Sequence, residues 1–187
     1  MNLINENSHR ILLADDNFDE QFLAERALKK ILSKGSTVRV VDSGNKAIAY
    51  MIGEGIYGDR SMYPFPSLVI TDLTMPDGDG FNVLEFLQSN PGWSVVPRIV
   101  FSSSENEEDV RTAFLLGASA YHIKGSHPGG LESQMRQILE YWTTSRVPPV
   151  DETGRLLETN SGGPSSRYPL PKRGGIMKRP RTNVTFG

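Results

Sequence analysis

Short apolar runs alternate five times with longer amphipathic stretches between residues 10 and 142, and this alternation constrains the fold more than any other feature of the chain. The apolar runs are rich in aliphatic and β-branched residues, as buried strands are. They occupy residues 10–14, 37–41, 67–71, 98–101 and 119–123. Because parallel strands need crossover connections, the pattern predicts an α/β fold with a five-stranded parallel sheet and helices on both faces.

Local signals place the ends of several predicted helices. Ser43 and Asp79 stand where an N-cap residue is expected, and both residue types accept hydrogen bonds from the first free amides of a helix. Ser104 and Glu107 have the spacing of a capping box, which predicts a helix that begins after Ser104. Residues 53–66 are rich in Gly, Pro and Tyr and are predicted to form a loop.

The character of the chain changes near its C-terminal end. From Pro148 onward the sequence is rich in Pro, Gly and Ser and shows no apolar periodicity. We therefore predict one folded domain over residues 8–146 and an extended or disordered tail over residues 147–187. The basic residues between Lys172 and Arg181 are typical of a solvated charge cluster.

Composition excludes several classes of site. The net charge is −2, and the tail from Pro148 has seven basic and three acidic residues, so the preceding part carries −6. An acidic body argues against nucleic-acid binding by the folded part. The absence of cysteine excludes disulfides, thiolate metal sites and a cysteine nucleophile. No apolar run approaches the roughly 20 residues that span a bilayer, and no secretory signal is evident, so we expect a cytoplasmic protein.

Chemically active residues follow the ends of four predicted strands. Asp15 and Asp16 close the first strand, Asp72 the third, Ser102 the fourth and Lys124 the fifth. In open α/β sheets, ligands bind beyond the carboxyl ends of the strands. We therefore expect these five side chains to form one site. Taken singly, the Asp15–Asp16 pair also suits a helix N-cap and Asp72 a turn, and only the combination favours a site.

The residue types in this set indicate magnesium-dependent phosphoryl chemistry. Carboxylate oxygens suit Mg²⁺, which is usually held by one or two carboxylates together with phosphate oxygens. The three histidines are scattered along the sequence, which argues against zinc or copper. Asp72 is a candidate nucleophile that forms an acyl phosphate, and Lys124 and Ser102 are candidates to stabilise the phosphoryl oxygens.

Four segments of the chain resemble the receiver domain of response regulators. They are LLADDN (12–17), TDLTMPDGDGFNVL (71–84), IVFSSS (99–104) and ASAYHIK (118–124). The resemblance covers about residues 8–145 and implies a doubly wound, flavodoxin-like (βα)5 fold with strand order 2-1-3-4-5. It also implies that Asp72 accepts a phosphoryl group from a sensor histidine kinase or a histidine phosphotransfer protein.

The resemblance to receiver domains also implies a role for each residue of this chain that matches the family's site motifs. By this resemblance, Asp16 and Asp72 should bind Mg²⁺ directly, Asp15 should bind it mainly through water, and the backbone carbonyl of Thr74 should complete the metal set.

On the phosphoryl side, the resemblance implies that Lys124 pairs with a phosphoryl oxygen. It also implies that Ser102 is the switch hydroxyl and that Tyr121 is the aromatic side chain that turns inward when Ser102 moves. This sequence departs from many receivers at Gly125, where they have a proline joined through a cis bond. A non-proline cis bond costs about 2.5–4 kcal/mol, so we expect a trans bond or unusual geometry between Lys124 and Gly125.

A narrower resemblance concerns the segments 90–110 and 138–142 and the long loop before the third strand. They look like single-domain regulators paired with bacterial phytochromes, which implies a red-light-sensing histidine kinase as partner. Signalling would then use the face made by residues 105–142, with a homodimer through that face as a hypothesis.

Two other functions remain open at this point. A magnesium-dependent aspartyl-phosphate hydrolase also needs Asp, Mg²⁺ and Lys, but such enzymes typically have a second acid where this chain has Thr74. The other is a receiver-like module that binds partners without phosphorylation. We favour a phosphoacceptor that is not an enzyme in the sense of turning over an external substrate.

Overall fold

Five parallel strands form the centre of the computed structural model, which describes residues 8–126 and 128–157. The strands are β1 (Arg10–Ala14), β2 (Thr37–Val41), β3 (Leu68–Thr71), β4 (Arg98–Ser102) and β5 (Ala120–Ile123). Their order in the sheet is β2-β1-β3-β4-β5, and every neighbouring pair is parallel. The predicted doubly wound, flavodoxin-like fold with strand order 2-1-3-4-5 is therefore confirmed.

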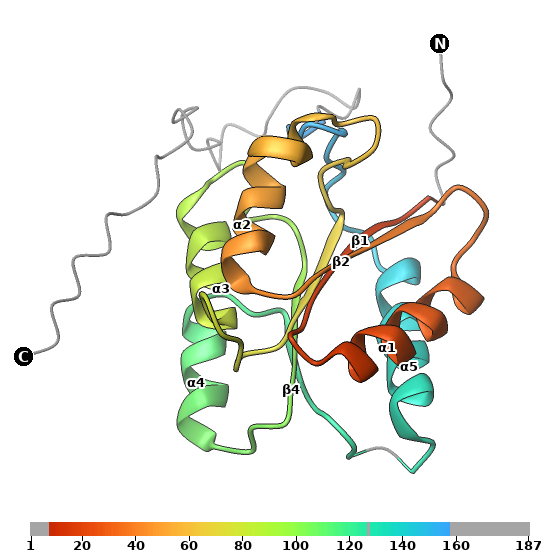
Figure 1. The fold of residues 1–187 in the computed structure, drawn as a ribbon, viewed down its shortest axis with the longest axis vertical. Coiled ribbons are helices and arrows are strands. Elements are labelled where there is room, and N and C mark those ends of the chain that lie inside the picture. The colour runs from red at the N-terminus through yellow and green to blue at the C-terminus, as the bar shows by residue number, and fades with distance from the viewer. Residues whose placement is uncertain (1–7, 127, 158–187) are drawn as a thin grey trace, which may run out of the picture.

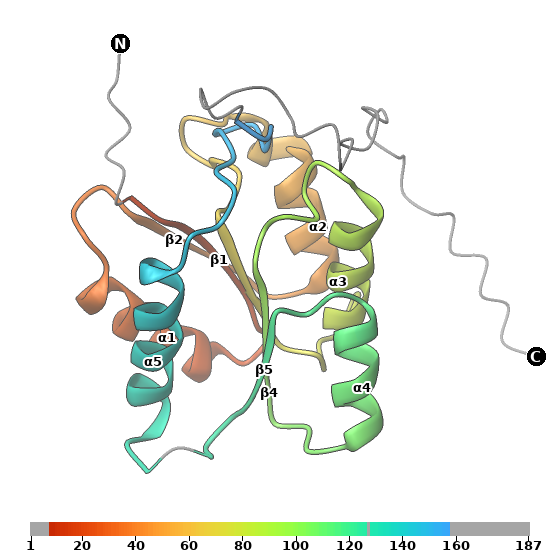
Figure 2. The ribbon, with the colours of Figure 1, turned by 180° about the vertical axis from the view of Figure 1, so that it is seen from behind.

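Helices cover both faces of the sheet (Figures 1 and 2). One face carries α1 (Phe18–Ile31) and α5 (Gly130–Thr144), which pack against each other. The other carries α2 (Gly44–Ile52), α3 (Gly80–Ser89) and α4 (Glu107–Leu115). The predicted loop before β3 contains one short 3-10 helix, η1 (Gly55–Gly58).

The core lies in two layers because successive strand residues point to opposite faces. In β1, Ile11 and Leu13 pack toward α1 and α5, whereas Leu12 and Ala14 pack toward α2 and α3. All four are buried, and burial of an isoleucine or leucine side chain contributes about 1.5–3 kcal/mol. A strand buried on both faces reads as a continuous apolar run, which is why the pattern was visible in the sequence.

The predicted caps are correct for two helices and wrong for one. Ser43 accepts a hydrogen bond from the Lys46 amide, and Asp79 forms a capping box with Asn82. The box predicted for Ser104 and Glu107 does not form, since α4 begins at Glu107 with Asn106 as its N-cap.

Residues 147–157, which we call the C-terminal strap, correct the predicted tail. Instead of extending away, the strap packs across the end of the sheet where the strands begin (blue in Figure 1). Arg10 Nη2 donates to the Val150 carbonyl at 2.6 Å, and the Phe65 amide donates to the Glu152 carbonyl at 2.8 Å. Val150 is buried in the core beside Phe65. The predicted tail from residue 158 onward lies outside the described residues.

The helices of the described residues can be compared with the length and apolarity that a membrane span requires. No helix within residues 8–126 and 128–157 is long and apolar enough to cross a bilayer.

Candidate functional site

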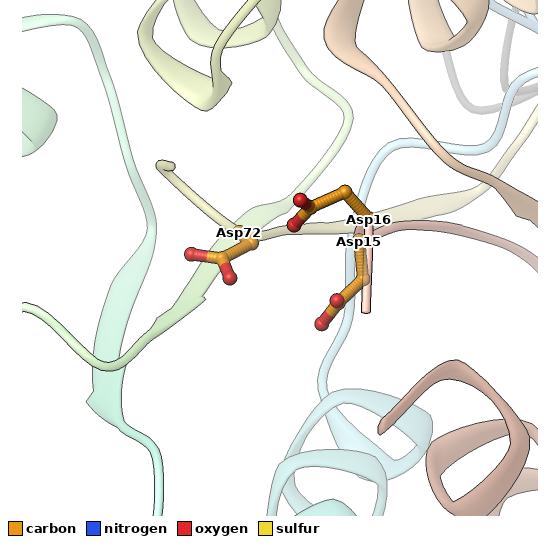
Figure 3. Close-up of side chains that lie close together, drawn as sticks. All are labelled: Asp15, Asp16 and Asp72. Carbon is orange, nitrogen blue, oxygen red and sulfur yellow. The ribbon is translucent and has the colours of Figure 1, made fainter. Parts of the chain in front are cut away.

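Three aspartates meet where β1 and β3 end. The two strands are neighbours, with Ala14 paired to Thr71, so the residues that follow them emerge side by side. The amide of Asp72 donates to the Ala14 carbonyl at 2.8 Å. One carboxylate oxygen from each of Asp15, Asp16 and Asp72 lies within 4.8 Å of the other two. Figure 3 shows the Asp16 carboxylate directed toward Asp72. Asp15 and Asp72 are buried, whereas Asp16 is exposed.

Lys124 reaches the same cluster from the end of β5. Its Nζ lies 2.8 Å from Asp15 Oδ2 and 2.6 Å from Asp72 Oδ2, and its side chain is only 10% exposed. The Lys124 amide donates to the Ser102 carbonyl at 2.8 Å, which aligns the residue after β5 with the end of β4. Among the described residues no peptide bond is cis, as expected for Lys124–Gly125, and Gly125 adopts a φ of 75°.

Burial and charge oppose each other at this cluster. Burial raises the pKa of Asp15, and the Lys124 ammonium partly offsets that effect. For Lys124, burial favours the neutral amine, but the hydrogen bonds that its ammonium donates to the carboxylates outweigh burial and raise the pKa. Lys124 is therefore a permanent positive charge at neutral pH, enclosed by acceptors and placed against Asp72.

The backbone around Asp72 fixes its carboxylate. Asp72 Oδ1 accepts hydrogen bonds from the amides of Leu73, at 2.6 Å, and Thr74, at 3.3 Å. Only glycine fits at position 80, because a Cβ there would collide with the carbonyl of Asp72. The carboxylate is thus oriented by amides at one oxygen and by Lys124 at the other.

The turn between Asp72 and α3 is tied to the start of α2. Asp77 has a φ of 56°, a conformation that Asp and Asn tolerate better than most residues. Its carboxylate accepts a hydrogen bond from Asn45 Nδ2 at 2.8 Å, and the Gly44 amide donates to the Gly78 carbonyl at 2.8 Å. This explains the Asp-Gly-Asp-Gly sequence as a structural feature of the turn.

Ser102 and Tyr121 lie on the side of the site toward α4. Ser102 is fully buried, and its Oγ accepts from the Ser104 amide at 3.4 Å. Tyr121 is half-buried and packs with Leu73 and Val100, and its hydroxyl donates to the Ser104 carbonyl at 2.9 Å. Ser104 Oγ donates to Asp109 of α4 at 2.6 Å. Ser104 therefore connects the segment after β4 and Tyr121 of β5 to α4.

Glu20 is the site residue that the sequence interpretation missed. Its Oε2 lies 2.5 Å from Lys124 Nζ, so three carboxylates surround the ammonium. No local signal singled it out, because Asp19 and Glu20 both stand in the first turn of α1 and are both acidic.

The donor set of the aspartate cluster fits a hard divalent cation. Asp15, Asp16 and Asp72 offer only carboxylate oxygens, and no histidine belongs to the cluster found among the described residues. Mg²⁺ and Mn²⁺ both favour such ligands. Thr74 is exposed, and its amide donates to Asp72 Oδ1 at 3.3 Å; a metal-binding role of its carbonyl stays a prediction.

Comparison with known proteins agrees with this geometry. The family profile described as response regulator receiver domain matches residues 11–136. Response regulator Rcp1 of Synechocystis sp. is 28% identical over 140 residues, covering 75% of this chain and 92% of Rcp1.

Solved structures give the same relationship. The phosphorylated cyanobacterial phytochrome response regulator RcpA superimposes with a TM-score of 0.69 at 30% identity, over 76% of this chain and 99% of RcpA. The Mn²⁺-bound form of Rcp1 gives a TM-score of 0.67 at 28% identity, over 75% of this chain and 99% of that one. The chain belongs to the response regulator receiver domain family.

Proposed function

We propose that this protein is a response regulator that accepts one phosphoryl group on Asp72 from a sensor histidine kinase or a histidine phosphotransfer protein. One observation carries the proposal: Lys124 Nζ contacts both Asp15 and Asp72 beside a cluster of hard oxygen donors. A nucleophilic carboxylate is thereby paired with a fixed positive charge where phosphoryl oxygens would develop negative charge. The chain covers 92% of Rcp1, a relative little longer than one domain, which supports output through the domain itself.

The residues divide the chemistry among them. A carboxylate oxygen of Asp72 attacks phosphorus as the bond to the donor's leaving group breaks, which forms an acyl phosphate on Asp72. Lys124 pairs with one phosphoryl oxygen and the Ser102 hydroxyl with another. Asp16, Asp72 and the Thr74 carbonyl would hold Mg²⁺, and Asp15 would hold it through water. When bound, the ion supplies positive charge that offsets the carboxylates and the phosphoryl oxygens.

A switch follows from the contacts of Ser104. A Ser102 hydroxyl drawn toward a phosphoryl oxygen would give up its hydrogen bond with the Ser104 amide, 3.4 Å long before phosphorylation. Ser104 is also the acceptor of the Tyr121 hydroxyl and the donor to Asp109. Tyr121 and α4 would therefore adjust together, and phosphorylation would shift a two-state equilibrium of α4, β5 and α5. A homodimer through that face is part of the proposal.

The partner is proposed from the relatives. RcpA is described as a phytochrome response regulator, and a bacteriophytochrome response regulator, AtBRR, superimposes at 27% identity with a TM-score of 0.57. We therefore propose a red-light-sensing histidine kinase as the donor.

Intact-mass measurement after treatment with acetyl phosphate and Mg²⁺ tests the function. We expect a gain of one phosphoryl group per chain with Mg²⁺, and no gain when EDTA replaces Mg²⁺. A generic phosphate ester should not be turned over, because the position of a hydrolase's second acid holds Thr74. Steady hydrolysis of that ester, or no mass gain at all, would contradict the proposal.

A further inference from the structure

Glu20 contacts Lys124 from a different direction than the strand-end aspartates. It belongs to the first turn of α1, where the Asn17 side chain accepts its amide hydrogen at 3.2 Å and so fixes the backbone from which it reaches. Its Oε2 lies 2.5 Å from Lys124 Nζ, with 34% of the side chain exposed. Glu20 is not a member of the aspartate cluster that suits a metal ion. Among the residues that the structure describes, the ammonium of Lys124 is the polar group that the Glu20 carboxylate contacts at the site.

The position of Glu20 opposes an anionic reactant. Glu20 Oε2 and Asp72 Oδ2 contact the same Nζ atom, at 2.5 and 2.6 Å, so the two oxygens are at most about 5 Å apart. A phosphoryl donor that approaches Asp72 therefore meets this negative charge in addition to those of the aspartates. Glu20 also competes with the incoming phosphoryl oxygens for the hydrogens of Lys124.

We propose that Glu20 is a positioning residue that holds Lys124 in place before phosphorylation and thereby slows phosphoryl uptake from anionic donors. This inference rests on the proposed function of Asp72. Once Asp72 carries the phosphoryl group, Lys124 exchanges its contacts with Glu20 and Asp72 for a phosphoryl oxygen. Glu20 sets the rate of uptake, whereas Asp72 determines whether uptake occurs.

The test compares Glu20→Gln with Asp19→Asn, a matched control in the same helical turn whose side chain is exposed. Both substitutions remove one acidic charge from the first turn of α1, so both weaken the favourable interaction with the helix dipole. The measurement is the initial rate of mass gain with acetyl phosphate, a small anionic donor, and Mg²⁺. We expect Glu20→Gln to be at least about threefold faster than wild type at low salt, and Asp19→Asn to match wild type.

Salt dependence separates charge from structure. The Debye length falls from about 30 Å at 0.01 M salt to about 3 Å at 1 M, so the advantage of Glu20→Gln should shrink as salt rises. A purely structural effect would not follow salt in this way. Glu20→Ala also removes the side-chain oxygen that Gln would keep as an acceptor for Lys124, and it should change the rate in the same direction. Circular dichroism checks that each variant is folded.

Two failures are distinguishable. If wild type gains mass but Glu20→Gln and Glu20→Ala are equal to it or slower at low salt, the inference about Glu20 is overturned and the role of Asp72 stands. If wild type gains no mass, the proposed function itself fails, and the inference fails with it.

Discussion

Gly154→Ala should detach or strain the C-terminal strap. Gly154 has a φ of 82°, which costs an L-residue about 1–2 kcal/mol. A Cβ there would also lie 2.7 Å from the Phe65 ring and 2.8 Å from Trp93 Nε1, and such overpacking costs about 1–3 kcal/mol. If the strap stays in place, the free energy of unfolding should therefore fall by about 2–5 kcal/mol.

Detachment of the strap would cost a similar amount. It would expose Val150, worth about 1.5–3 kcal/mol, and break the hydrogen bonds to Arg10 and Phe65, worth about 1 kcal/mol each. Urea denaturation measures the loss. In a Trp142→Phe background Trp93 is the only tryptophan, and it is 9% exposed, so a detached strap should red-shift its emission.

Gly92→Ala is the matched control, because a Cβ at Gly92 meets nothing within 4 Å and its φ is not positive. The control should leave both stability and emission unchanged. A loss below about 0.5 kcal/mol for Gly154→Ala, with unchanged Trp93 emission, would show that the strap is not packed as described.

Two smaller predictions concern β5. Tyr121→Phe removes the hydroxyl that donates to the Ser104 carbonyl, so urea denaturation should show a free energy of unfolding lower by about 0.5–1.5 kcal/mol. An unchanged midpoint would mean that this hydrogen bond does not form in solution. Burial lowers the pKa of His122 in the folded protein, so the unfolded chain binds a proton on His122 first as pH falls. The stability contributed by burying the neutral imidazole therefore declines from about pH 6.5 downward through the folded-state pKa. His122→Gln should therefore flatten the fall in unfolding free energy between pH 7 and 5, and an equally steep fall in the variant would contradict this assignment.

The strands and most caps could be predicted because their causes are local. An apolar run such as residues 10–14 indicates a strand that is buried on both faces. Ser43 and Asp79 each accept a hydrogen bond from an amide three residues later, so the sequence around each cap is enough to predict it. The gathering of Asp15, Asp72 and Lys124 followed from one topological rule about parallel sheets. The cap at Ser104 failed because Asn106 competes for the same helix end and is closer to it.

What the sequence did not reveal depends on contacts between distant residues. The strap has no periodicity of its own and is held by Arg10, 140 positions earlier, so nothing in residues 147–157 alone indicates that they pack. Glu20 was missed because two acids, Asp19 and Glu20, open α1, and only the docking of that helix on the sheet decides which one meets Lys124.

The identity of the phosphoryl acceptor is the claim on which the account depends most. Intact mass after acetyl phosphate and Mg²⁺ treatment should show one added phosphoryl group on wild type and on Asp19→Asn, and none on Asp72→Asn. Asp72→Asn keeps the size of the side chain and an oxygen that can accept from Leu73, so the fold should persist. A phosphoryl group that still appears on folded Asp72→Asn would contradict the assignment of Asp72.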